Sequence, residues 1–158
     1  MVKLEADAQQ QFRVMRVKPS DKQAEEAYRL IVDELPAPDA KPQKGIQLVM
    51  RYSLPLFVNV QNNAEPKLQW RAEKAANGKA VLVAENTGNA HAQLSNITFQ
   101  TTSAKDALTL ASGLAGYVLP GNTWKRELEV SPASLNTGRL NATVNGMPIQ
   151  TEVRFAAP

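Results

Sequence analysis

The sequence predicts an all-β protein, with an immunoglobulin-like β-sandwich domain preceded by a partial immunoglobulin-like domain that ends in a long β-hairpin. Most of the chain alternates apolar and polar residues, which is the period-two pattern of strands that bury one face. Turn pairs, among them Asn77-Gly78 and Asn145-Gly146, separate these short runs. About seven runs follow residue 66, as an immunoglobulin-like sandwich of roughly 100 residues requires.

Three strands are expected in the first part of the chain. Residues 11–18 and 27–35 alternate along their length, and residues 36–44 carry prolines typical of a solvated loop. The longest run, residues 45–54, should end or bend at Pro55, because proline cannot donate a hydrogen bond to a ladder. Three strands with one apolar face would leave that face in water, so this part is interpreted as an incomplete sandwich.

The domain boundaries follow from this count of strands. We predict a partial domain over residues 1–58 and a complete sandwich over residues 66–158. The expected strands of the sandwich are residues 68–73, 79–86, 92–101, 114–119, 124–130, 139–144 and 149–155. Further turns are expected at Thr87-Gly88-Asn89, Pro120-Gly121 and Thr137-Gly138.

Composition limits the classes of partner. The chain is 43% hydrophobic and 21% charged, which is typical of a globular protein. It has no run of about 18 apolar residues, so we expect no membrane insertion. The net charge is only +3 and the basic residues are scattered, so we expect no nucleic-acid partner. The first residues form no apolar run, and we expect no secretory signal peptide in this chain.

The residues give little support for catalysis. His91 is the only histidine and the chain has no cysteine, which excludes a thiol nucleophile and a cysteine-ligated metal. No Gly-x-Ser-x-Gly elbow accompanies His91, which we expect to be a surface or turn histidine. The adjacent carboxylates Glu25-Glu26 and Asp33-Glu34 are interpreted as solvated charges on opposite faces of a strand. We therefore expect no enzyme and no metal site.

One stripe of side chains is a candidate binding surface. Ile46, Leu48, Met50 and Tyr52 fall on the same face of the strand at residues 45–54. They are either the core face of an ordinary strand or the face of an edge strand that presents itself to another protein. A long apolar edge is usually suppressed, and where it is retained it suits strand addition to a partner.

Several segments resemble one protein family. Residues 25–36 (EEAYRLIVDELP) resemble the signature of the periplasmic pilus-assembly chaperones of the chaperone–usher pathway. Residues 45–58 look like the donor strand of that family, and residues 86–89 and 116–121 resemble marks of its second domain. The likeness covers nearly the whole chain from about residue 10. Its departures from the common pattern resemble the archaic branch of the family.

This resemblance implies donor-strand complementation, in which the chaperone lends a strand to a pilus subunit that lacks its own last strand. Ile46, Leu48, Met50 and Tyr52 would fill the groove of the subunit. The implied partners are pilin subunits and an outer-membrane usher, the implied location is the periplasm, and no cofactor is required. The resemblance also implies that the signal sequence and about four strands are absent, so we expect self-association through the exposed hairpin.

One departure concerns the basic residues that clamp the terminal carboxylate of a pilin in this family. One of them lies on a first strand that we expect this chain to lack, and the other aligns with Ser53. Arg29 and Arg51 are the candidate carboxylate anchors in their place.

The residues are also compatible with two other functions. The chain could be a structural or adhesive β-sandwich subunit of a surface fibre, with the stripe forming its own core. It could also be an enzyme on a sandwich scaffold, which the single histidine disfavours. Chaperone and subunit are distinguished by whether the strand at residues 45–54 lies at a sheet edge with its stripe exposed.

Overall fold

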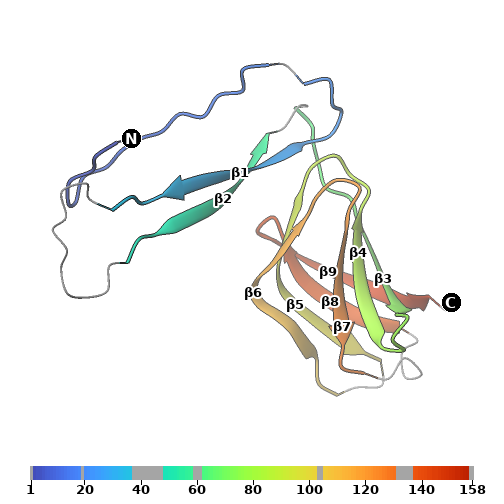
Figure 1. The fold of residues 1–158 in the computed structure, drawn as a ribbon. Helices are drawn as coiled ribbons and strands as arrows, with labels where there is room; N and C mark the ends of the chain where they lie inside the picture. The colour runs from blue at the N-terminus through green and yellow to red at the C-terminus, as the bar shows by residue number, and fades with distance from the viewer. Residues whose placement is uncertain are drawn as a thin grey trace.

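The structure is a computed structural model that describes residues 2–18, 20–36, 48–58, 62–102, 105–130 and 137–156. Within these ranges the regular structure is all strand, so the predicted all-β class is confirmed. The strands form a two-stranded sheet and a seven-stranded sheet (Figure 1). They are β1 (Glu26–Asp33), β2 (Arg51–Val58), β3 (Leu68–Lys74), β4 (Ala80–Asn86), β5 (Ala92–Thr101), β6 (Leu108–Val118), β7 (Thr123–Leu128), β8 (Thr137–Val144) and β9 (Met147–Ala156).

The seven-stranded sheet, which we call the sandwich, has the strand order β6-β5-β8-β9-β3-β4-β7. Its pairs are antiparallel except for β3 with β9, which run parallel where Ala72 faces Phe155. Leu82 of β4 belongs to the same buried cluster as Leu94 of β5 and Leu140 of β8. The two ends of the sheet therefore fold over each other as two layers, the architecture of an immunoglobulin-like domain.

A β-bulge in β5 keeps its apolar side chains on the core face. Leu94 is buried before the irregularity, and Ile97 and Phe99 are buried after it, so the alternation shifts by one residue. Asn96 takes up the extra residue with a φ of 50°, a left-handed conformation that asparagine tolerates. Its side-chain oxygen accepts a hydrogen bond of 2.8 Å from the Gly113 N–H on β6.

Three local expectations from the sequence are wrong. Residues 11–18 form no strand, because alternation makes a strand only where a neighbouring strand supplies hydrogen bonds. Thr137 and Gly138 open β8 instead of forming a turn, and Gly138 is required there because a Cβ would lie 2.3 Å from the Phe99 ring. The strand expected at residues 45–54 is not formed at residues 48–50, since β2 begins at Arg51. β2 instead continues through Pro55, which is paired with Arg29, because an edge strand can accommodate proline.

The two-stranded sheet, which we call the hairpin, consists of β1 and β2 in antiparallel register. The hairpin contributes no residue to the buried hydrophobic cluster of the described structure, whose members all lie between residues 72 and 153. Figure 1 shows the hairpin extending away from the sandwich, joined to it at one end. In the part of the chain that the structure describes, no helix has the length and apolarity to cross a membrane.

Candidate functional site: the hairpin

The hairpin has one apolar face. Residues that are directly paired in an antiparallel sheet point to the same side. Leu30 is paired with Leu54 and Val32 with Tyr52, so these four side chains share a face. With the alternate residues along both strands, the apolar face comprises Tyr28, Leu30, Val32, Met50, Tyr52, Leu54 and Leu56.

Met50 and Tyr52 of the predicted stripe lie on this face, and the described residues of the stripe are open to solvent. Leu48 is 81% exposed, Met50 50% and Tyr52 49%. Met50 precedes β2 but is held in the same ladder, because its N–H donates to the Glu34 carboxylate and its carbonyl accepts from the Glu34 N–H at 2.8 Å. Ile46, the fourth predicted residue, lies outside the described residues.

β2 is an edge strand in the described structure. It is paired with β1 on one side, and its other side has no partner strand among the described residues. An edge strand presents unpaired N–H and C=O groups, which can receive a strand from another chain. Tyr52 of the stripe lies on this strand, and Met50 directly precedes it in the same ladder, so the stripe leads into the open edge.

The opposite face of the hairpin carries the two candidate carboxylate anchors. The Arg51 guanidinium donates two hydrogen bonds to Asp33, one of them 3.0 Å long. This contact lowers the pKa of the Asp33 carboxyl and raises that of Arg51. Arg29 instead donates to the neutral Ser53 hydroxyl at 3.2 Å, and no carboxylate among the described residues lies within ion-pair distance of it.

Glu26 fastens the irregular N-terminal segment to the hairpin. Its carboxylate accepts hydrogen bonds from the Tyr28 hydroxyl at 2.7 Å and from the Ser20 hydroxyl at 2.8 Å. Arg16 lies 2.8 Å from it as an ion pair. The Tyr28 and Ser20 hydrogen bonds, aided by the cations Arg16 and Lys22, lower the pKa of Glu26. The expectation that Glu26 is a solvated charge is wrong, because it is buried.

Three residues connect the hairpin to the sandwich, and the sequence did not single them out for this role. The Glu25 carboxylate accepts hydrogen bonds from His91, and the His91 ring stacks on Phe57 of β2. We call Glu25, Phe57 and His91 the joint. Glu25 is buried, so the expectation of a solvated carboxylate is wrong. His91, expected on the surface or in a turn, lies in the loop before β5 with its side chain 23% exposed. These residues lie far apart in sequence, and only the acidic pair and the single histidine could have drawn attention to them.

The described residues offer no metal site. No group of three or more histidine, cysteine, aspartate or glutamate side chains lies close enough together among them to hold an ion.

Comparisons with known proteins agree with this picture. Residues 1–62 match the family described as pili and flagellar-assembly chaperone, PapD N-terminal domain. No curated protein sequence matches the chain significantly. A chain in the crystal structure of the CsuC–CsuE chaperone–tip adhesion subunit pre-assembly complex, from the archaic chaperone–usher Csu pili of Acinetobacter baumannii, matches with a TM-score of 0.56 and 26% sequence identity.

The structural match covers 89% of this chain and 65% of the matched chain. It therefore extends over the sandwich as well as the hairpin, whereas the family match covers the hairpin region alone. The two matches agree on a chaperone of pilus assembly, which the residue signature around β1 also predicted. The chain is therefore similar to the pilus-assembly chaperones, in sequence over residues 1–62 and in fold over most of its length.

Proposed function

We propose that the protein is a periplasmic chaperone that binds pilus subunits by donor-strand complementation and delivers them to an outer-membrane usher. The observation that supports this most directly is that β2 combines exposed apolar side chains, Tyr52 and Leu54, with an open sheet edge, and that Leu48 and Met50 precede it. A pilus subunit that lacks a strand would add to this edge, with β2 as the strand that completes its sheet.

The apolar face supplies the main binding energy in this proposal. Leu48, Met50 and Tyr52 alternate along the strand, so they would enter successive positions of one groove on the subunit. Each side chain of this size contributes roughly 1.5–3 kcal/mol when it is fully buried. Backbone hydrogen bonds along β2 would set the register and would be the same for every subunit.

Arg29 is the better of the two candidate carboxylate anchors. The charge of Arg51 is already matched by Asp33, and a second carboxylate would have to compete for the same donors. Arg29 places its cationic group at Ser53, the position where the resemblance expects a basic residue. A terminal carboxylate would find an unneutralised guanidinium there, and charge-assisted hydrogen bonds to carboxylates are among the strongest in proteins.

The alternative is a structural or adhesive subunit of a surface fibre, in which the stripe forms part of the subunit's own core. That function requires the stripe to be covered. In the described structure the stripe is exposed, which favours the chaperone. The matched crystal structure also contains a chaperone bound to a tip adhesion subunit.

The test compares two neighbouring residues directly before β2, of which Met50 belongs to the predicted stripe and Val49 does not. Met50 and Val49 are each 50% exposed. We expect Met50→Asp to lower the capture of a purified pilus subunit by at least about tenfold, because the charge would enter an apolar groove. Val49→Asp should leave capture nearly unchanged. Equal effects of the two substitutions, or capture by neither variant nor the parent, would overturn the proposal.

A further inference from the structure

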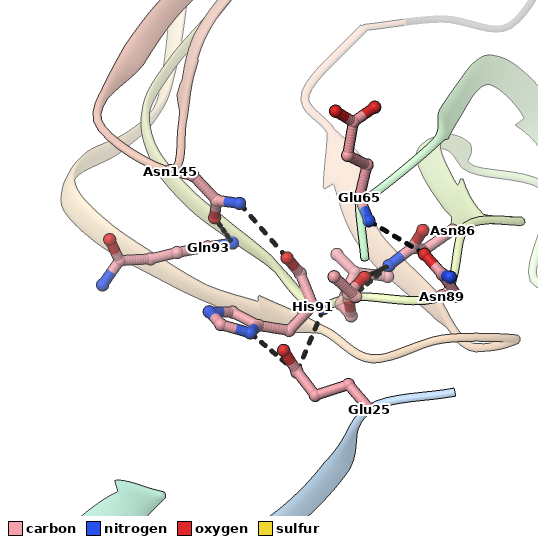
Figure 2. Close-up of polar contacts among 9 residues, drawn as sticks. Glu25, Glu65, Asn86, Asn89, His91, Gln93 and Asn145 are labelled. Carbon is pink, nitrogen blue, oxygen red and sulfur yellow. Dashed lines mark hydrogen bonds and ion pairs between the residues drawn. The ribbon is translucent and has the colours of Figure 1, made fainter. Parts of the chain in front are cut away.

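His91 lies between the hairpin and the sandwich and is bonded to both. Its backbone N–H donates to the Glu25 carboxylate at 3.1 Å, and its ring Nδ1 lies 2.7 Å from the same oxygen. The Glu25 N–H in turn donates to the Asn89 carbonyl at 2.8 Å. Figure 2 shows the Glu25 side chain reaching from the hairpin to His91 on the sandwich. The Glu25 side chain is only 2% exposed, so these bonds are shielded from water.

The ring of His91 makes a second contact with the hairpin. It stacks on Phe57 of β2 with 3.7 Å between the ring centroids and an angle of 15° between the planes. Tyr117 of β6 lies 5.8 Å from the His91 ring and 5.2 Å from the Phe57 ring, both in tilted geometry. Glu25 leads into β1 and Phe57 is on β2, so His91 contacts both arms of the hairpin.

The sandwich holds His91 in a fixed position. The Asn145 side-chain amide donates to the His91 carbonyl at 3.2 Å, and its oxygen accepts from the Gln93 N–H at 2.7 Å (Figure 2). Before the histidine, the buried Asn86 amide donates to the carbonyls of Ala90 at 2.7 Å and Val118 at 2.8 Å. The histidine therefore projects from a loop that is bonded on both sides.

The segment between β2 and β3, which contains Glu65, packs against the same loop. A Cβ at Gly88 would lie 2.3 Å from the Glu65 carbonyl oxygen, so only glycine allows this close approach. The Asn89 side chain accepts from the Glu65 N–H at 2.8 Å, and the Asn89 N–H donates to the Glu65 carbonyl at 3.1 Å. The loop that carries His91 therefore also contacts the segment that joins the hairpin to the sandwich.

We infer that His91 is a positioning residue that fixes the direction of the hairpin on the sandwich through Glu25 and Phe57. Two elements of one chain joined by a small contact ordinarily move relative to each other. Here the contact combines a buried carboxylate with a stacked ring, so it restrains rotation as well as separation. The direction of β2 determines how a bound subunit would meet the sandwich, and this consequence rests on the proposed function.

The absence of cysteine from the chain makes a direct distance measurement possible. Spin labels at Leu35→Cys and Met147→Cys, both exposed positions, report the distance between hairpin and sandwich by pulsed electron paramagnetic resonance. We expect one narrow distance distribution for the parent. Glu25→Ala and His91→Ala should each broaden it, with the undocked population rising by about tenfold or more as bonds to a charged group are lost.

Two milder variants separate the parts of the joint. His91→Phe keeps a flat ring against Phe57 but loses the contact of Nδ1 with Glu25. His91→Asn keeps a side-chain N–H donor but loses the ring. Each should restore part of the narrow distribution that His91→Ala loses, which a general loss of folding would not reproduce. Tryptophan fluorescence checks the fold independently, because Trp70 and Trp124 both lie in the sandwich.

Glu26→Gln is the matched control. Glu26 is the next residue in the chain and is equally buried, but its side-chain partners, Arg16, Ser20, Lys22 and Tyr28, all belong to the hairpin region. It should leave the distance distribution unchanged. A broad distribution in the parent, or a narrow one in both Glu25→Ala and His91→Ala, would overturn the inference. No subunit is present in this measurement, so its failure is distinct from failure of the proposed function.

Discussion

The sandwich and the hairpin contain the same kinds of side chain in opposite environments. In the sandwich, leucine, isoleucine and phenylalanine side chains of four strands meet in one buried cluster. In the hairpin and the segment before it, most large apolar residues are exposed, whereas Leu114 and Met147 are the large exposed apolar residues of the described sandwich. Both regions alternate with period two. Alternation therefore establishes that a strand has an apolar face but does not establish what covers it.

The two regions also differ in how they satisfy polar groups. Asn86, inside the sandwich, is fully buried. Its side-chain NH₂ group donates hydrogen bonds to two backbone carbonyls, and its side-chain oxygen accepts hydrogen bonds from the N–H groups of Lys67 and Gly88. The buried polar groups of the hairpin region, Glu25 and Glu26, lie where β1 begins. The rest of the hairpin depends on its two-stranded ladder, and a two-stranded sheet alone is only marginally stable.

The largest difference should appear when a leucine is truncated in each region. Leu82 is 0% exposed in the sandwich core, so Leu82→Ala should lower the free energy of unfolding by about 2–5 kcal/mol. Leu54 is 48% exposed, and Leu54→Ala should change it by about 0.5 kcal/mol or less. Urea unfolding followed by far-ultraviolet circular dichroism, which reports the strands of both regions, measures both. Similar losses would mean that the apolar face of the hairpin is covered in solution.

A smaller and local effect is expected from acid. The pKa of Glu26 is lowered, chiefly by the Tyr28 hydrogen bond, from an ordinary value of 4.5. Its ionised form therefore stabilises the attachment of the N-terminal segment above that value, and the stabilisation is lost as the pH falls through the lowered pKa. Nuclear magnetic resonance shifts of Arg16 and Ser20 should follow this transition.

Glu26→Gln provides the control for the acid transition. The glutamine side chain has no carboxyl group to protonate, so the nuclear magnetic resonance shifts of Arg16 and Ser20 should show no transition in this pH range. An acid transition of the same size in this variant would mean that another group holds the segment.

The smallest effect is expected on the outer surface of the sandwich. Lys79 donates to Glu127 at 2.6 Å, and this bond lowers the pKa of Glu127, but both side chains are well exposed. Lys79→Ala should shift the urea midpoint by an amount close to the limit of measurement, and added salt should reduce the shift further. A loss as large as that of Leu82→Ala would contradict the conclusion that the buried cluster, not surface charge, stabilises the sandwich.

Much of the fold was predictable from local patterns. The all-β class, the seven strands of the sandwich and the Asn145-Gly146 turn between β8 and β9 are confirmed, although β6 begins at Leu108, six residues before the strand expected at residues 114–119. These features depend on alternation and on residues that adopt positive φ, and both are properties of short segments. The apolar stripe at Leu48, Met50 and Tyr52 could be identified for the same reason.

Other features were decided by contacts between distant segments. The sequence of residues 11–18 alternates as a strand does, but pairing requires a neighbour that the segment itself cannot specify. The order of strands in the sandwich, the open edge of β2 and the different partners of Arg29 and Arg51 all depend on register between strands. Glu25 and His91 are separated by 66 positions and meet through one carboxylate oxygen. The residue pattern within one segment does not predict such a contact, because hydrogen bonding and ring stacking require side chains from distant segments to lie close together, and only the folded chain places them there.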